Sequence, residues 1–398
     1  MPETVHARHD MVRASRYDVV IIGAGINGAG IARDAAMRGL TVLVIEKGEI
    51  GAGTTSASTR LIHGGLRYLE HFEFGLVYES LHERETLLRI ASDFVRPLAM
   101  AIPIYKQSRR GWLTIRAGMV LYDLLSWGKS LPRHQMLSRA ESLERWPGLN
   151  PEGLVGSALY YDAQVEFPER LVLANVLSGR EFGAEVLTHT RVTGLSASGV
   201  EFGGQLVEAN VIINAAGPWI DLVLAPVNGP RLIGGTKGSH IIVPVFQGAP
   251  ANAIYLEARS DGRPIFIIPW NKLYLIGTTD VPFEGDPDEV RCEDWEIDYL
   301  LSETNLALPV AKLARDNILQ TYSGVRPLPY QSSTRRHFIR EHPQLNNLLS
   351  IVGGKLTTYR SLSEECVDLI FRKLGKNPPP CRTATEILTT DNTDKIRI

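Results

Sequence analysis

The sequence has few cysteines and none of the spacings on which cysteine-based sites depend. Its three cysteines, Cys292, Cys366 and Cys381, form no C-x-x-C pair, and their number is odd. Zinc sites and disulfide frameworks need paired or clustered cysteines, so we expect neither a bound metal nor a disulfide. The pattern indicates a reduced, cytoplasmic protein in which each cysteine is a small core or surface residue.

The sequence also lacks a charge bias and a long apolar run. Its 42 basic and 44 acidic residues give a formal net charge of −2, which argues against nucleic-acid binding driven by bulk charge. No stretch approaches the length of a transmembrane helix, about eighteen uncharged apolar residues. Residues 1–16 lack the apolar core of a signal peptide, so we expect an unstructured leader. Peripheral attachment to the cytoplasmic membrane stays open.

A strand–helix–strand unit follows the leader. YDVVIIG and TVLVIEK are apolar runs rich in β-branched residues, and GINGAGIARDAAMRG between them has helical character. Gly23, Gly25 and Gly28 form a G-x-G-x-x-G turn, where the backbone can approach a pyrophosphate at the helix N-terminus. Glu46 ends the second strand, where its carboxylate can accept a hydrogen bond from a ribose hydroxyl. The unit predicts a dinucleotide-binding, Rossmann-like α/β domain.

Two later segments favour FAD over NAD as the dinucleotide. Gly353, Gly354 and Lys355 lie between a predicted strand and a helix expected to start near Leu356. The N–H groups of such a helix start can stabilise negative charge on a reduced flavin ring. Residues 214–217 (NAAG) end another buried strand with small side chains that let the backbone approach the cofactor. Taken singly, each segment is equally well explained as an ordinary strand-to-loop exit.

The rest of the pattern divides between helices and an antiparallel sheet. Helical periodicity covers residues 72–91, 168–182 and 295–308. After Pro230, short apolar runs (SHIIVP, AIYLEA, PIFIIPW and LYLIGTTD) are separated by glycine, proline and asparagine. This spacing predicts short antiparallel strands.

The stretch STRLIHGGLRYLE, residues 58–70, carries cations, a histidine and a Gly-Gly pair between apolar residues. Ordering such polar groups without partners is costly, so we infer that the segment binds a ligand. Five cations lie near glycines or turns rather than on a helix face: Arg67, Arg326, Arg335, Arg336 and Lys355. A guanidinium group matches phosphate oxygens in pairs, which favours a small phosphorylated substrate. For any single arginine, a surface position or an ion pair is the alternative.

Two histidines and a tyrosine are candidates for proton transfer and orientation. His63 and His240 have side chains that normally titrate near neutrality and can accept a proton from a substrate hydroxyl. Tyr68 offers a hydroxyl that can orient a substrate. For each of the three, a purely structural role stays open.

Six motifs occur in the order of a known flavoprotein family. GAGINGAGIARDAAMRG, STRLIHGGLRYLE, KGSHIIVP, LIGTTD, TYSGVRPL and GGKLTTYR resemble the FAD-dependent, aerobic-type glycerol-3-phosphate dehydrogenases of the D-amino-acid-oxidase-like superfamily. The similarity runs from Tyr17 to Lys373. It implies an α/β fold in which a Rossmann-like FAD-binding domain is interleaved with an antiparallel-sheet α+β substrate domain. Many members continue for roughly another hundred residues as a helical domain, which we expect to be absent here.

The resemblance implies a division of the chain and a reaction. The expected FAD-binding domain comprises residues 17–85, 160–226 and 320–376, the substrate domain 86–159 and 227–319, and the tail 377–398. The family oxidises sn-glycerol 3-phosphate to dihydroxyacetone phosphate. A hydride passes from C2 to flavin N5, the C2 hydroxyl loses its proton, and the electrons pass to quinone.

The motifs also assign the site residues. The expected catalytic group is Arg326, His63, His240 and Lys355, and the expected substrate-binding group is Arg67, Tyr68, Arg326, Arg335 and Lys355. Arg336 competes with Arg335 for the phosphate, because the segment before them looks short. Since an arginine rarely gives up its proton, a histidine is the better proton acceptor, with Arg326 supporting an alkoxide. The pair Gly64 and Gly65 would let the backbone lie against the flavin ring.

The expected cofactor is non-covalent FAD. Its predicted contacts are Gly23, Gly25, Gly28, Glu46, Lys47, Thr55, Ser56, Ala216, Gly217, Gly354, Lys355, Leu356 and Thr357. The resemblance further implies a quinone acceptor, while a membrane surface and a second copy of the chain stay open as partners. The basic stretch 106–112 before an apolar run at 113–125 fits an interfacial anchor, and the alternative is an amphipathic helix that covers the substrate domain.

Two rival activities stay open at this point. An oxidase of the same family would pass electrons to oxygen, but the substrate region has no long extra insertion of the kind we associate with that oxidase. An amine or amino-acid oxidase would bind a carboxylate, and the four cations Arg67, Arg326, Arg335 and Lys355 exceed what one carboxylate requires. Both observations favour the dehydrogenase.

Overall fold

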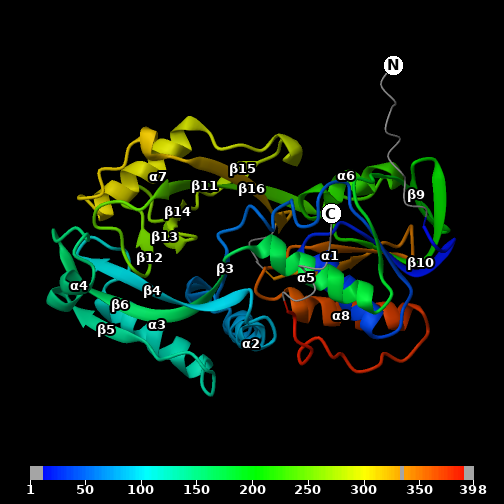
Figure 1. Ribbon diagram of the computed structural model, residues 1–398, viewed down its shortest axis with the longest axis horizontal. Coiled ribbons are helices and arrows are strands. Elements are labelled where there is room, and N and C mark those ends of the chain that lie inside the picture. Colours follow the sequence, from blue (N-terminus) through cyan, green and yellow to red (C-terminus); the bar gives the residue numbers. More distant parts are fainter. Residues whose placement is uncertain (1–11, 332–335, 390–398) are drawn as a thin grey trace.

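Two sheets lie in two neighbouring lobes of the computed structural model, which describes residues 12–331 and 336–389 (Figure 1). The first sheet has the strand order β17-β18-β10-β1-β2-β7; β9 also pairs with β10, and β8 pairs with β9. Its strands are β1 (Arg16–Ile22), β2 (Val42–Ile45), β7 (Glu185–Leu187), β8 (Val192–Leu195), β9 (Gly199–Phe202), β10 (Gln205–Asn214), β17 (Phe338–Glu341) and β18 (Leu348–Val352). Strands β18, β10, β1, β2 and β7 run parallel, as expected for a Rossmann-like domain.

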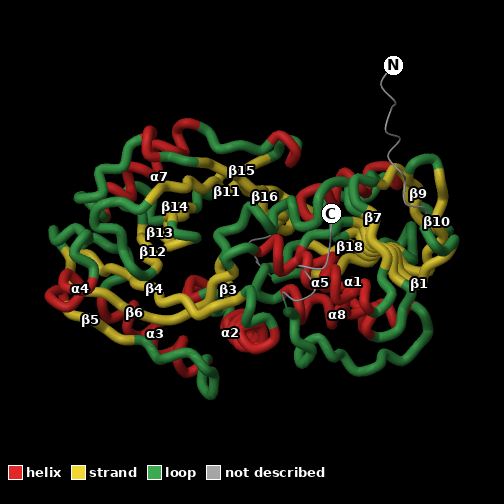
Figure 2. Tube along the Cα trace, in the orientation of Figure 1, coloured by secondary structure: helices red, strands yellow, loops and turns green. Residues whose placement is uncertain are grey.

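Helices α1 (Ile26–Met37), α5 (Pro168–Glu181) and α8 (Tyr359–Lys373) lie together on one side of this sheet (Figure 2). Val19 and Ile21 of β1 pack in one apolar cluster with side chains of α1 and α8. Val20 and Ile22 face the opposite cluster, which includes residues of β9 and β10. Because both faces of β1 are buried, its sequence is a continuous apolar run rather than an alternating one.

The second sheet is antiparallel among its described neighbours except where β12 pairs with β4. Its strands are β3 (Leu61–Ile62), β4 (Val95–Tyr105), β5 (Gln135–Ser138), β6 (Leu154–Val165), β11 (Ile233–Pro244), β12 (Ala253–Glu257), β13 (Pro264–Trp270), β14 (Leu273–Gly277), β15 (Val281–Phe283) and β16 (Gln320–Pro329). The four short apolar runs after Pro230 form β11, β12, β13 and β14, which confirms the predicted antiparallel sheet.

The other helices connect or cover the sheets. They are α2 (Phe74–Ile90), α3 (Trp112–Leu125), α4 (Arg139–Arg145), α6 (Ile220–Leu224) and α7 (Asp294–Ala307), with the 3₁₀ turns η1 (Leu66–His71), η2 (Gly217–Trp219), η3 (Ala225–Val227), η4 (Pro287–Glu289) and η5 (Arg315–Asn317). The helices predicted at 72–91, 168–182 and 295–308 correspond to α2, α5 and α7. In the two described ranges, every helix is too short or too polar to cross a bilayer.

Two features differ from the sequence-based expectation. Helix α8 begins at Tyr359 rather than near Leu356, because the Thr358 N–H donates to the Lys355 carbonyl (3.1 Å) and closes a separate turn first. Residues 160–165 and 320–329, which we expected in the FAD-binding domain, contribute to β6 and β16 of the second sheet. The domain limits themselves stay a prediction.

Candidate functional site

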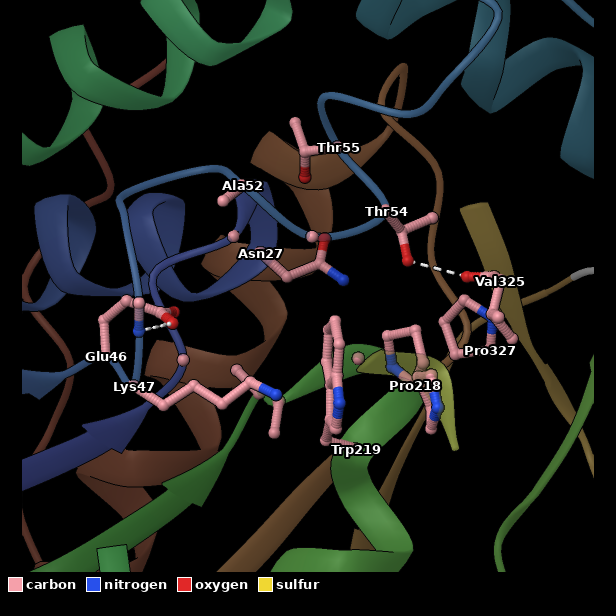
Figure 3. Close-up of a pocket in the computed structure, with 18 of the residues that line it drawn as sticks. Asn27, Glu46, Lys47, Ala52, Thr54, Thr55, Pro218, Trp219, Val325 and Pro327 are labelled. Carbon is pink, nitrogen blue, oxygen red and sulfur yellow. Dashed lines mark hydrogen bonds between the residues drawn. The ribbon is translucent and has the colours of Figure 1, made fainter. Parts of the chain in front are cut away.

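A cavity of about 530 Å³ opens between the first sheet and strand β16 (Figure 3). Its wall includes most of the residues predicted to contact the cofactor: Gly23, Gly25, Glu46, Lys47, Thr55, Ala216, Gly217, Gly354, Lys355 and Leu356. Three predicted contacts, Gly28, Ser56 and Thr357, do not line the cavity. They contact backbone groups of neighbouring segments instead. The Ser56 hydroxyl, for example, donates to the Ala52 carbonyl (2.9 Å).

The glycine turn closes tightly beneath helix α1. Gly23 has a φ of +103°, and a Cβ at this position would lie 2.8 Å from the Ala215 carbonyl oxygen. A Cβ on Gly28 would lie 1.9 Å from the Gly23 carbonyl oxygen, so the first turn of α1 accepts only glycine there. Gly25, Ile26 and Asn27 line the cavity at the N-terminus of α1, where free N–H groups favour an anion.

Glu46 is fixed at the end of β2 by two backbone groups. Its Oε2 accepts from the Ala24 N–H (2.7 Å), and its Oε1 accepts from the Gly48 N–H (2.8 Å). Glu46 lines the cavity, and each carboxylate oxygen can accept a further hydrogen bond. This geometry suits a ribose hydroxyl, as the sequence predicted.

Sequence reasoning missed several residues of this cavity. Trp219 lines it, and the Lys47 ammonium lies 3.9 Å from the centroid of the Trp219 ring (Figure 3). Thr54 also lines it and donates to the Val325 carbonyl (2.6 Å), which joins the loop after β2 to β16. Trp219 follows shortly after the small residues 215–217 at the exit of β10, and this position was the available sequence signal for an aromatic wall.

The GGK turn and the HGGLRY segment meet at one end of the cavity. The Lys355 ammonium lies 3.9 Å from the centroid of the Tyr68 ring, and its nitrogen is shielded from solvent. The Thr357 hydroxyl contacts the backbone of His63, accepting from its N–H at 3.1 Å. These contacts bring Lys355, Tyr68 and His63 together, although more than 280 residues separate the two segments.

Gly64 faces the protein interior rather than the cavity. A Cβ on Gly64 would lie 2.3 Å from the Tyr122 hydroxyl and 2.4 Å from Leu81. The Gly64 N–H donates to the Tyr122 hydroxyl (3.0 Å) and to Asp162 (3.1 Å), both of which are buried. Gly64 is therefore required by the packing of α2 and α3, and the expectation that its backbone lies against the flavin ring stays a prediction.

Asp162 organises this buried network. Its Oδ1 accepts from the Tyr122 hydroxyl and from Arg84 Nη1, each at 2.7 Å. Arg84 and Asp162 have side chains only 1% and 2% exposed. Beyond Gly64, Gly65 has a φ of +75° and turns the chain into η1, which carries Arg67 and Tyr68. The network thus sets the start of the segment that reaches Lys355.

The Arg326 side chain extends from β16 toward Asp280 and Thr278. Its neighbours Val325 and Pro327 line the cavity, whereas Arg326 Nη1 donates to Asp280 (2.9 Å) and Nη2 to the Thr278 hydroxyl (2.9 Å). A Cβ on Gly238 would lie 2.3 Å from Arg326 Nη2, so the side chain crosses β11 at that glycine. Arg326 belongs to the cavity-lining strand β16 but is not among the residues that line the cavity.

The remaining predicted phosphate ligands lie in different places. Arg67 is half-buried on η1 and close enough to Tyr255 to act on its hydroxyl electrostatically. Arg335 lies outside the described residues. The Arg336 carbonyl is next to Gly353, where a Cβ would approach it to 3.4 Å, which brings this backbone beside the GGK turn. The choice between Arg335 and Arg336 stays a prediction.

His240 is a buried residue of strand β11 in the second sheet. Its Nε2 lies 3.0 Å from the Thr59 hydroxyl, and its ring stacks on Tyr322 with centroids 4.8 Å apart. Burial, with the nearby positive charges of Arg326 and Arg60, lowers the pKa of His240 from 6.5 to about 3. A group with such a low pKa is a weak proton acceptor, so the geometry favours a positioning role for His240 on the segment that carries Thr59.

This burial predicts a pH dependence of stability. Between pH 6.5 and about 3 the unfolded chain binds a proton at His240 and the folded chain does not. Stability is therefore lost as the pH falls below 6.5, by about 2 kcal/mol at pH 5. We expect His240→Gln, which keeps an acceptor or donor for Thr59, to show a smaller fall in melting temperature between pH 7 and pH 5. Parallel pH profiles for the two proteins would contradict this.

Comparison with known proteins supports the cofactor. The family model described as "FAD dependent oxidoreductase" matches residues 18–358. The chain belongs to this family. Its cofactor is therefore FAD, and the observed cavity fits that group: a glycine turn that no Cβ could enter, a helix N-terminus for a pyrophosphate, and a fixed carboxylate for a ribose.

Individual members of the family extend the comparison. A glycerol-3-phosphate dehydrogenase of Synechocystis sp. is 49% identical over 409 residues, covering 95% of this chain and 74% of the relative. A D-erythritol 1-phosphate dehydrogenase of Brucella abortus is 40% identical and covers 89% of this chain and 73% of its own. The solved structure of a glycerol-3-phosphate dehydrogenase of Bacillus halodurans complexed with FAD has a TM-score of 0.75 at 28% identity. It covers 92% of this chain and 67% of that chain.

Proposed function

We propose that this chain is an FAD-dependent dehydrogenase that oxidises sn-glycerol 3-phosphate to dihydroxyacetone phosphate. The observation that carries the proposal is the meeting of Lys355 with Tyr68 and His63 at the end of the FAD cavity. A shielded ammonium there provides a positive charge for a phosphate ester or a developing alkoxide. The names of the relatives at 40% identity and above support a phosphorylated polyol as the substrate.

The chain's residues divide the work of this reaction. FAD, when bound, supplies the hydride acceptor. Lys355 and Arg67 bind the phosphate and orient the alcohol carbon, with Tyr68 packed beneath the Lys355 ammonium. His63 is the better candidate to accept the hydroxyl proton, because the pKa of His240 is lowered to about 3. Arg326 adds positive charge from behind β16, held by Asp280.

The proposal is tested by substrate choice with oxygen excluded. Under nitrogen, sn-glycerol 3-phosphate should bleach the bound FAD, whereas glycerol should not, because glycerol lacks the charge that Lys355 and Arg67 bind. D-erythritol 1-phosphate is the second candidate, since the Brucella relative carries that name. Faster bleaching by D-erythritol 1-phosphate would move the proposal to the longer polyol. Bleaching by glycine alone would replace it with an amino-acid oxidase.

We further propose that the electrons pass to quinone rather than to oxygen. The resemblance to aerobic-type dehydrogenases supports this choice, and the oxidase is the alternative. The two are separated by turnover under air: an oxidase would release peroxide in step with product. A dehydrogenase would need an added quinone analogue and release little peroxide.

We propose that the chain is cytoplasmic and docks on a membrane surface. Four side chains on or just after α3 are exposed and recur at helical spacing: Leu113 (77%), Val120 (54%), Leu124 (62%) and Trp127 (71%). Two other residues that we expected in the anchor make contacts within the protein instead. Trp112 packs on Gly156 of β6, and Arg110 pairs with Glu70 (2.8 Å). A homodimer remains a prediction.

Docking through α3 can be tested by measuring how much protein sediments with lipid vesicles. We expect Leu124→Glu with Trp127→Glu to remove most of the protein that sediments with anionic vesicles, because charge on this face opposes burial in the interface. Leu319→Glu is the matched control, since Leu319 is similarly exposed (61%) but follows η5. Equal sedimentation of both variants and the unmodified chain would remove α3 as the docking face.

A further inference from the structure

One wall of the FAD cavity comes from the second lobe. Pro287, Asp288 and Val290 line the cavity near Glu46, together with Lys47 and Arg191 of the first lobe. These three residues belong to the connection between β15 and α7, which extends from the second sheet toward the first lobe (Figure 1). We call residues 286–290 the closing loop.

The closing loop is a preformed turn. The Asp288 N–H donates to Asp286 Oδ1 (2.9 Å), and the Glu289 N–H donates to the Asp286 carbonyl (3.0 Å). Pro287 fixes its own φ at the first position of η4. The loop therefore presents the Asp288 carboxylate with little conformational freedom left to lose.

Asp288 holds cations of the first lobe. Lys47 Nζ lies 2.5 Å from Oδ1 and 2.7 Å from Oδ2 of Asp288, and Arg191 Nη2 lies 3.8 Å from Oδ2. The same Lys47 ammonium lies 3.9 Å from the centroid of the Trp219 ring. Lys47 thus lies between the closing loop and an aromatic side chain that lines the cavity. It contacts both, so it connects the loop to the cavity wall.

We propose that Asp288 is a latch that retains FAD by tying the closing loop to Lys47 and Arg191. The interaction joins the two lobes across the cavity, so the cofactor leaves only after the loop separates from both cations. The inference rests on FAD binding within the proposed function, and the choice of substrate does not enter it.

An opposite electrostatic effect is also built into the site. A carboxylate that lines the cavity repels the negative charge of FAD, so its removal would strengthen binding if repulsion dominated. Against this, the single negative charge of Asp288 lies beside two cations, Lys47 and Arg191. The Lys47 ammonium contacts both carboxylate oxygens of Asp288. The pairing therefore screens the carboxylate from the cofactor, and the latch is the dominant effect.

The test follows FAD release from diluted holoprotein through the recovery of flavin fluorescence. We expect Asp288→Asn to release FAD roughly three- to tenfold faster, a range set by the modest energy of partly exposed ion pairs. Release from the unmodified holoprotein should accelerate with added salt, and the variant should respond less. Glu289→Gln is the matched control: it removes the same charge from the next residue of the loop, where the described contacts include no ion pair.

A double-mutant cycle identifies the partner of Asp288. In a Lys47→Gln background, Asp288→Asn should accelerate release much less than in the unmodified chain, because the main contact is already lost. Unchanged or slower release in Asp288→Asn, or equal acceleration in Glu289→Gln, would overturn the latch alone. A purified chain that binds no FAD would overturn the latch and the proposed function together.

Discussion

Replacing Lys355 with methionine is expected to slow the anaerobic reduction of FAD by glycerol 3-phosphate by roughly 10²- to 10³-fold. The Lys355 nitrogen is shielded from solvent, lines the FAD cavity and lies 3.9 Å from the Tyr68 ring centroid. Positive charge in such a place holds a phosphate ester more strongly than it does in water, and so keeps the alcohol carbon in position for hydride transfer. Methionine keeps most of the length of the side chain and removes the ammonium group with its charge and its hydrogen-bond donors. Stopped-flow absorbance of the flavin measures the rate.

The matched control lies on the helix that follows the GGK turn. Lys373 is in the last turn of α8, pairs with Glu341 at 2.7 Å and is not among the residues that line the cavity. Lys373→Met makes the same chemical change without touching the site, so it should leave the rate of flavin reduction near that of the unmodified chain. Equal rates in both variants would show that the Lys355 ammonium takes no part in the reaction.

Replacing Asp162 with asparagine is expected to destabilise the fold by about 3–5 kcal/mol. The change leaves the Arg84 guanidinium without its carboxylate partner. Because the two side chains are only 1% and 2% exposed, solvent cannot replace that partner. It also weakens the acceptor of the Gly64 N–H, so the turn into η1 loses support. Denaturant unfolding followed by tryptophan fluorescence measures the loss.

An exposed ion pair of the same length provides the control. Arg315 Nη2 lies 2.7 Å from Asp298 Oδ2, and the two side chains are 48% and 60% exposed. Asp298→Asn should leave the unfolding midpoint almost unchanged, because solvent already screens that pair. If Asp162→Asn were as stable as this control, the buried network would contribute nothing to the fold.

The local parts of the fold could be predicted from the sequence. The run that became β1, the glycine turn and the start of α1 are dictated by neighbouring residues, since an apolar run buried on both faces and a positive φ at Gly23 leave few alternatives. Glu46 followed from its place at the end of β2. These same residues form the glycine-turn end of the FAD cavity.

The non-local parts could not be predicted in this way. Asp288 reaches Lys47 across 241 residues of chain, and no local pattern marks its carboxylate as a cavity wall. Gly64 is a glycine because Tyr122 and Leu81 from other helices fill the space of a Cβ, which only the packed structure reveals. Strand β16 mixes polar residues with glycine and proline and has no apolar run, so only its pairing with β11 places it in the second sheet.

Arg326 shows the same limit at the level of a single side chain. The motif SGVRPL places it beside the cavity, but strand alternation decides which way it points. Val325 and Pro327 take the cavity face, and Arg326 turns to Asp280 and Thr278. A role for Arg326 as electrostatic support for the reaction therefore stays a prediction.

The most direct measurement is a crystal structure of the chain with FAD and dihydroxyacetone phosphate bound. The account predicts FAD in the cavity that Gly23, Glu46 and Gly354 line, with the product phosphate hydrogen-bonded to the Lys355 ammonium and the product beside His63. A product phosphate bound away from Lys355, with the HGGLRY segment on the far side of the cofactor, would contradict it.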